Sequence, residues 1–159
     1  MAEAAALYTL DGVVKRRAAA DTAFELRLDG LRVAPGEALA VMGVSGSGKS
    51  TLLDLLSFTA QPDEAARFAF APRGAKPVDV ARVWRQGRGE ALTGLRARRI
   101  GYVLQTGGLL PFLSVRDNIE LPQRISGRRD PGLVAELAER LDIAGELRRM
   151  PAQLSVGQR

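Results

Sequence analysis

One nine-residue segment constrains this chain more than any other. Residues 43–51 read GVSGSGKST and fit the pattern G-x-x-x-x-G-K-[ST]. The apolar run Ala38–Met42 precedes the segment, and the leucine-rich stretch Ser50–Phe58 follows it. A short, fully apolar run is typical of a strand that is covered on both faces, and the leucines indicate a helix. The pattern therefore predicts a strand, a glycine loop and a helix, in that order.

The chemistry of this loop suits phosphate. Its glycines let consecutive backbone N–H groups point inward at phosphate oxygens, and the N-terminus of the following helix adds partial positive charge. Lys49 can bridge the β- and γ-phosphates, and the Ser50 hydroxyl can join the shell of a Mg²⁺ ion. We therefore expect binding of a nucleoside triphosphate, with candidate contacts from Gly43, Ser45, Gly46, Ser47, Gly48, Lys49, Ser50 and Thr51.

Other classes of nucleotide-binding protein fit less well. A dinucleotide fold needs G-x-G-x-x-G and a later ribose-binding acid, and neither is in the right place. A GTPase needs Asn-Lys-x-Asp to read its base, but the only Asn is Asn118, and Leu121 stands where Asp is required. A nucleoside kinase stays open, although nothing indicates a lid or an acceptor site.

Composition excludes several further functions. The 159 residues contain no Cys and no His, which excludes disulfides, thiolate metal sites and imidazole chemistry within them. Apolar runs are too short to span a bilayer, and no signal peptide is evident. The net charge is +5, but aromatic residues make up only 5%, so we interpret the scattered arginines as solvated surface or partner contacts, not as a nucleic-acid platform.

The first hundred residues mix strands with helices. Leu7–Val14 is one candidate strand, and the alternating apolar and polar residues of Phe24–Val33 predict a half-buried antiparallel strand. Further predicted elements are a strand over Arg67–Ala71, helices over Val78–Arg85 and Glu90–Arg98, and a second buried strand over Ile100–Leu104.

The remaining residues are predicted to be helical. Ser114 and Asp117 have the spacing of a capping box, for a helix that runs towards Leu121-Pro122. Asp130-Pro131 predicts an N-cap followed by proline in the first turn. The stripe Leu133, Leu137 and Leu141 is interpreted as core packing.

Three segments beyond the loop resemble one protein family. Ile100–Gln105 (IGYVLQ) resembles the strand and Q-loop of ABC transporter ATPases, and residues 109–119 resemble the start of their helical subdomain. Pro151–Arg159 (PAQLSVGQR) resembles the ABC signature motif and its approach. The resemblance covers essentially the whole chain and favours the branch of lipoprotein-releasing and macrolide-exporter ATPases.

The resemblance implies roles for the matching residues. Lys49, Ser50 and the glycine loop would bind ATP and Mg²⁺. Gln105 would reach the Mg²⁺ ion and the attacking water, so that Gln105 and Lys49 are the catalytic candidates. Ser155 and Gly157 would contact the γ-phosphate bound by a second ATPase subunit, in a head-to-tail dimer; Ser155 is expected to open a helix.

Two departures from the family pattern stand out. Val156 replaces the usual first glycine of the signature, where a β-carbon would crowd the partner's γ-phosphate. The family stacks adenine on an aromatic of the N-terminal sheet, but the matching neighbourhood here is Arg16-Arg17. The sequence leaves Arg17, Tyr8 and Phe24 as alternatives for that contact.

The family's Walker B strand, D-loop and switch His all lie beyond the signature motif. We therefore expect a partial domain, truncated after the signature. The Walker B strand lies between the P-loop strand and the Q-loop strand in this family, so Ala38–Met42 and Ile100–Leu104 would be left without a neighbour and residues 1–159 alone would fold poorly.

The predicted fold class is α/β: a P-loop NTPase core (36–105) with an N-terminal antiparallel β subdomain (1–35) and a helical subdomain (106–159). The predicted protein is the ATP-binding subunit of an ABC transporter, which hydrolyses Mg-ATP to drive a separate transmembrane permease and is peripheral at the cytoplasmic face of the cell membrane. Alternatives are a non-catalytic nucleotide-binding or regulatory fragment and an ABC ATPase of repair or translation type. No nucleic-acid partner is expected.

Overall fold

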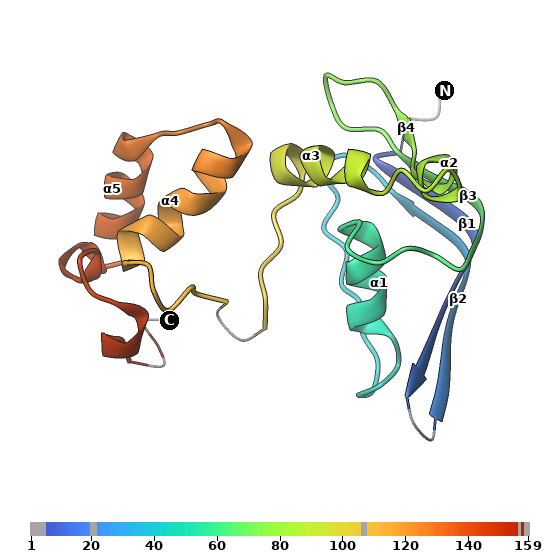
Figure 1. Ribbon diagram of the computed structural model, residues 1–159, viewed down its shortest axis with the longest axis horizontal. Helices are drawn as coiled ribbons and strands as arrows, with labels where there is room; N and C mark the ends of the chain where they lie inside the picture. The colour runs from blue at the N-terminus through green and yellow to red at the C-terminus, as the bar shows by residue number, and fades with distance from the viewer. Residues whose placement is uncertain (1–5, 20–21, 106–107, 156, 158–159) are drawn as a thin grey trace. The chain divides into compact units, whose positions relative to one another are not determined.

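The computed structural model describes residues 6–19, 22–105, 108–155 and 157. The chain forms two compact units, Met1–Arg99 and Ile100–Arg159. The first unit is a sheet with three helices, and the second contains only helical elements among its described residues (Figure 1). No helix in the described ranges has the length and apolar character that a bilayer crossing requires.

A four-stranded antiparallel sheet is the framework of the first unit. Its strands are β1 (Tyr8–Ala19), β2 (Thr22–Val33), β3 (Glu64–Phe70) and β4 (Val78–Asp79), in the order β2-β1-β3-β4. Tyr8 lies opposite Val33 on one side and Phe70 on the other. The predicted antiparallel pair at the N-terminus and the predicted strand near residue 67 are confirmed.

Three helices accompany this sheet: α1 (Lys49–Leu56), α2 (Val80–Arg85) and α3 (Glu90–Arg99). Each was expected from the sequence, but the helix predicted over Val78–Arg85 begins two residues late. Val78 and Asp79 pair with Phe70 and Ala69 as β4, and the Asp79 carboxylate then caps α2 by accepting from the Arg82 N–H at 2.9 Å.

Aromatic side chains form the core of the first unit. Phe58, Phe68 and Phe70 are buried, and the Phe58 ring centroid lies 5.9 Å from that of Phe68 and 5.4 Å from that of Phe70. The Tyr8 ring joins them at 4.7 Å from Phe70, and its hydroxyl donates to the Leu56 carbonyl at 2.9 Å. Burial raises the pKa of Tyr8 to about 12. Tyr8 therefore ties the sheet to the end of α1.

The two predicted buried strands are not strands. Ala38–Met42 in the first unit and Ile100–Leu104 in the second belong to no sheet, and the side chains of Met42 (88% exposed) and Val103 (95%) are open to solvent. An apolar run becomes a buried strand only when neighbouring strands satisfy its N–H and C=O groups. No described strand pairs with either segment.

The second unit is built on α4 (Val115–Ser126) and α5 (Pro131–Arg140), followed by the short 3-10 helices η1 (Ala144–Glu146) and η2 (Pro151–Gln153). Both predicted caps are confirmed: Ser114 accepts from the Asp117 N–H at 3.1 Å, and Asp130 accepts from the Leu133 N–H at 2.9 Å. Helix α4 continues past Pro122 and ends at Gly127, whose φ is 71°.

The predicted core stripe on α5 is wrong. Leu133, Leu137 and Leu141 are exposed, whereas Val134 and Ala138, one position further along, are buried. The core of this unit consists of Val115, Ala138, Leu147 and Leu154. Helix α5 therefore turns the face of Val134 and Ala138 inward and leaves its leucines outside.

Helix α4 also carries a buried carboxylate. Glu120 is only 3% exposed, and its Oε2 lies 3.1 Å from the guanidinium groups of both Arg124 and Arg129. Arg116 is 3.8 Å from the other carboxylate oxygen. The hydrogen bond from Arg124, followed by that from Arg129, lowers the pKa of Glu120 against the opposing effect of desolvation.

Glu120→Gln is expected to weaken the second unit at neutral pH, because three guanidinium groups lose their shared anion. The folded carboxyl has a lowered pKa, so its stabilisation is present above the ordinary value of 4.5 and is lost as the pH falls through the folded pKa. Hydrogen exchange of α4 amides in the full-length protein measures this: the parent and the variant should differ at pH 7 and converge in acid. Glu136→Gln, at an exposed ion pair, is the matched control; an equal effect there would contradict the assignment.

Candidate nucleotide-binding site

The loop that joins Ala38–Met42 to α1 is shaped by its glycines. Gly43 has φ 152°, and a Cβ there would lie 2.6 Å from the Ser47 hydroxyl oxygen. Gly48 has φ 96° at the N-cap of α1, and a Cβ there would lie 2.7 Å from Cζ of Phe24. Side chains at these two positions would both strain the backbone and collide with neighbours. The GVSGSGKST pattern thus encodes a tight turn that a bulkier sequence cannot adopt.

Lys49 folds back over this turn. Its Nζ donates to the Gly43 carbonyl at 2.8 Å and to the Val44 carbonyl at 2.7 Å, and it lies 3.5 Å from the Ser47 hydroxyl oxygen. The first turn of α1 contains no acidic residue, and the Ser50 side chain is exposed. An ammonium group without a carboxylate partner, a helix N-terminus and exposed loop residues suit an anion at this position.

One side chain of the hairpin packs against the loop, and another contacts the helix that follows it. Arg17 on β1 is the register partner of Phe24 on β2. The Phe24 ring packs against Gly48, and the Arg17 guanidinium lies 2.5 Å from the Asp54 carboxylate of α1. Tyr8, the third residue that the sequence left open as a base contact, is instead part of the aromatic core. The strand register brings Phe24 to the loop and Arg17 to Asp54 of α1, and no local sequence signal distinguishes these two placements.

The structure brings the residues of the loop together, and the other candidates belong to the second unit. Gln105, Ser155 and Gly157 are all exposed there. Val156 lies outside the described residues, as do Gln158 and Arg159, so the expected helix at Ser155 remains a prediction. The approach of these three residues to a bound nucleotide also remains a prediction.

Asn118 orders the segment that follows Gln105, a role that the sequence did not reveal. Its Oδ1 accepts from the Leu110 N–H at 2.7 Å, and its Nδ2 donates to the carbonyls of Leu110 and Leu113. A third contact joins Nδ2 to the Ser114 carbonyl at 3.0 Å. One side chain thereby contacts four backbone groups of residues 110–114, which explains why a residue with both amide donors and an amide acceptor suits this position.

Comparison with known proteins shows the family to which the chain belongs. The model of the family described as ABC transporter matches residues 27–159. The chain belongs to the ABC transporter family. Among curated ABC relatives, the macrolide export ATP-binding/permease protein MacB of Chromobacterium violaceum is 37% identical over 155 residues, which are 94% of this chain and 22% of that protein. The probable export ATP-binding/permease protein MacB of Pseudomonas entomophila is 35% identical over 156 residues.

A solved ABC structure shares the fold. The ATP-binding cassette MJ0796, described as a dimer in a post-hydrolysis state bound to ADP and Pi, aligns with a TM-score of 0.73 and 28% identity, over 95% of this chain and 64% of that one. The α/β class and the resemblance to macrolide exporters are confirmed. The chain spans about a fifth of the length of the curated ABC relatives that it matches.

Proposed function

We propose that this chain is the ATP-binding part of an ABC transporter that hydrolyses Mg-ATP to drive export through a membrane permease. The observation that carries the proposal is the loop of residues 43–51, with Lys49 folded over it at the N-terminus of α1. In this proposal the loop N–H groups and Lys49 hold the β- and γ-phosphates, and Ser50 and Gln105 contribute to a Mg²⁺ site. Mg²⁺ would supply charge neutralisation at the phosphates.

The relatives favour transport over the other classes. Both MacB proteins are described as export ATP-binding/permease proteins, which supports a permease partner and weighs against a repair or translation ATPase. The dimeric state described for the MJ0796 cassette supports a head-to-tail dimer, in which Ser155 and Gly157 would face the partner's γ-phosphate. The protein would act at the cytoplasmic face of the cell membrane.

Phosphate release by the full-length protein tests the proposal directly. We expect Mg-ATP turnover that depends on Gln105 and rises with protein concentration as dimers form. Nucleotide binding without turnover would instead support the alternative of a non-catalytic, regulatory module.

We assign the adenine contact to Phe24, whose ring already lies against the loop at Gly48. Base–aromatic stacking contributes about 1–3 kcal/mol, so Phe24→Ala is expected to lower ATP affinity roughly tenfold. The affinity for inorganic tripolyphosphate, which has no base, should not change. Tyr8→Phe, which removes only the hydroxyl bound to Leu56, is the control; a drop in tripolyphosphate affinity in Phe24→Ala would show that the ring merely supports the loop.

Val156→Gly is expected to tighten ATP-dependent dimerisation of the full-length protein. The family resemblance places this position at a backbone-to-phosphate contact, where glycine alone approaches without a side chain. Analytical ultracentrifugation with ATP, in a background that blocks hydrolysis, measures the dimer affinity. Unchanged or weaker dimerisation would mean that valine is accommodated there.

A further inference from the structure

The positive charge of this chain is concentrated in one segment. Residues 67–99 contain nine basic and two acidic residues, whereas the remaining 126 residues contain 14 basic and 16 acidic ones. The segment alone therefore accounts for the net positive charge of the chain. A general preference for arginine would spread the excess along the sequence, so this localisation needs its own explanation.

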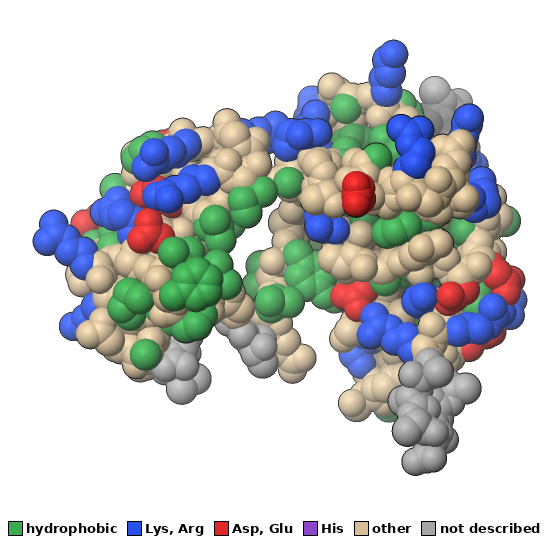
Figure 2. Space-filling view, in the orientation of Figure 1, with side chains coloured by type: hydrophobic (Ala, Val, Ile, Leu, Met, Phe, Trp, Pro, Cys, Tyr) green, Lys and Arg blue, Asp and Glu red, His purple; other side chains and the backbone are tan. Residues whose placement is uncertain are grey.

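Most described arginines outside this segment contact carboxylates, Arg128 and Arg148 being exceptions. On the β1–β2 hairpin Arg16 contacts Glu25 at 2.9 Å and Glu64 at 2.5 Å, and Arg27 shares Glu25 at 3.0 Å. Such pairs are visible as mixed red and blue beside the hairpin (Figure 2). None of the nine basic residues in the fully described segment 67–99 forms an ion pair, and the Asp79 carboxylate is occupied by capping α2.

Six of the nine basic side chains have no hydrogen-bond or ion-pair partner. The other three, Arg85, Arg96 and Arg99, donate to backbone carbonyls of the first unit. The six are exposed, and we call them the basic edge: Arg67, Arg73, Lys76, Arg82, Arg88 and Arg98.

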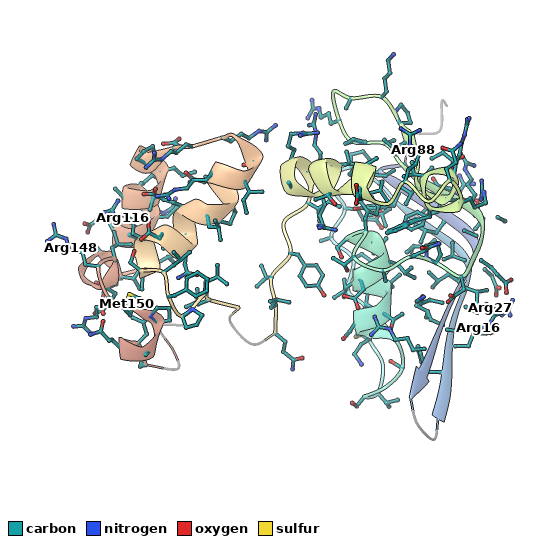
Figure 3. The ribbon with its side chains drawn as sticks, in the orientation of Figure 1. Arg16, Arg27, Arg88, Arg116, Arg148 and Met150 are labelled. Atoms are coloured by element: carbon teal, nitrogen blue, oxygen red, sulfur yellow. The ribbon has the colours of Figure 1, made fainter. Side chains whose placement is uncertain are left out.

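Two hydrogen bonds show where the segments that carry the basic edge lie relative to the nucleotide loop. The Arg99 guanidinium reaches the Arg73 carbonyl at 3.5 Å, which brings the end of α3 to the β3–β4 loop. Arg96 reaches the carbonyl of Phe58, just beyond the C-terminal end of α1, whereas the nucleotide loop precedes the N-terminal end of that helix. Figure 3 labels Arg88 at the end of the first unit that lies away from the nucleotide loop. In Figure 2 that end carries several basic groups and one acidic group.

We propose that the basic edge docks on a bilayer surface rich in anionic phospholipid. This inference rests on the proposed function, which places the chain beside a membrane. Guanidinium groups bind phosphate oxygens well, and unpaired cations spread over a loop, a strand and two helices match a broad anionic surface. Bringing like charges together disfavours the fold, and an anionic surface relieves that cost.

A nucleic acid fits the basic edge less well. The two phenylalanines of β3 are buried in the core. Trp84 packs so closely on Gly89 that a Cβ there would lie 2.3 Å from the indole ring. No aromatic side chain in this fully described segment is thus free to stack on bases.

The test uses the full-length protein with its membrane part in lipid nanodiscs, and measures amide hydrogen exchange over residues 71–99. We expect protection in discs containing about a third phosphatidylglycerol, no protection in phosphatidylcholine discs, and loss of protection in high salt. Each basic residue near such a surface contributes about fivefold to affinity, so the combined change Arg82→Gln, Arg88→Gln and Arg98→Gln should weaken docking roughly a hundredfold. Arg128→Gln, Arg140→Gln and Arg148→Gln form the control with equal loss of charge.

Each other outcome overturns the inference. Equal protection in both lipids would mean that the permease itself covers this edge. Protection that appears only when RNA is added would identify a nucleic-acid surface. ATP affinity, measured in parallel with a fluorescent analogue, should be the same in the triple variant and the parent. If the parent protein itself did not bind ATP, that result would count against the proposed function and not against lipid docking.

Discussion

Lys49→Ala is expected to abolish ATP binding in the full-length protein. In the structure the Lys49 ammonium holds the carbonyls of Gly43 and Val44, so it both supplies positive charge and closes the turn. A hydrogen bond to a charged group contributes about 1.5–3 kcal/mol, which alone lowers affinity by up to roughly a hundredfold, and disordering of the loop adds to this loss. The affinity of a fluorescent ATP analogue in the presence of Mg²⁺ measures the effect.

The chain offers a close control for this variant. It contains only three lysines, and Lys76 is exposed in the β3–β4 loop, away from the nucleotide loop. Lys76→Ala removes the same side chain and the same charge, and should leave ATP affinity unchanged. If Lys49→Ala retained the parent affinity, residues 43–51 would not be the phosphate site.

A protein consisting of residues 1–159 alone is expected not to hydrolyse ATP and not to unfold cooperatively. Ala38–Met42 and Ile100–Leu104 lie outside any described sheet and expose apolar side chains, so no strand pairing holds the segment that leads into the loop. Loss of one preorganised catalytic group lowers kcat about a hundredfold to a thousandfold, and the family resemblance places two such carboxylates beyond the signature motif. Phosphate release with Mg-ATP and thermal melting followed by circular dichroism measure both effects.

The reference for that experiment is the same fragment with Lys49→Ala. Equal phosphate release from the two fragments is the expected result. A cooperative melt together with turnover above this reference would show that a carboxylate already within the 159 residues polarises the water.

Elements fixed by local chemistry could be predicted from the sequence. The GVSGSGKST turn, the Ser114 and Asp130 caps and the alternating strands all depend on residues within a few positions of one another. The glycine positions in the loop are explained by backbone sterics that involve their immediate surroundings. Local rules of this kind hold whether or not the rest of the domain is present.

Features that depend on distant partners could not be predicted. Apolar character alone indicated buried strands at Ala38–Met42 and Ile100–Leu104, but burial requires neighbouring strands that sequence periodicity does not reveal. The buried face of α5 lies one position from the predicted stripe, at Val134 and Ala138, because the rotation of a helix on its neighbours depends on distant packing partners. The choice among the candidate base contacts also depends on cross-strand register, which places Phe24 against Gly48 and buries the Tyr8 ring in the aromatic core.

The first turn of α4 has a mechanical consequence within the second unit. Its leading N–H groups are not left to solvent: the Val115 N–H donates to the Arg149 carbonyl at 2.9 Å, and the Arg116 N–H donates to the Leu147 carbonyl at 3.0 Å. Asn118 hydrogen-bonds residues 110–114 to that end of α4, and Met150 alone separates Arg149 from η2. Residues 110–114 and residues 147–149 are thus hydrogen-bonded to the same end of α4, so a displacement of one segment is expected to be transmitted to the other.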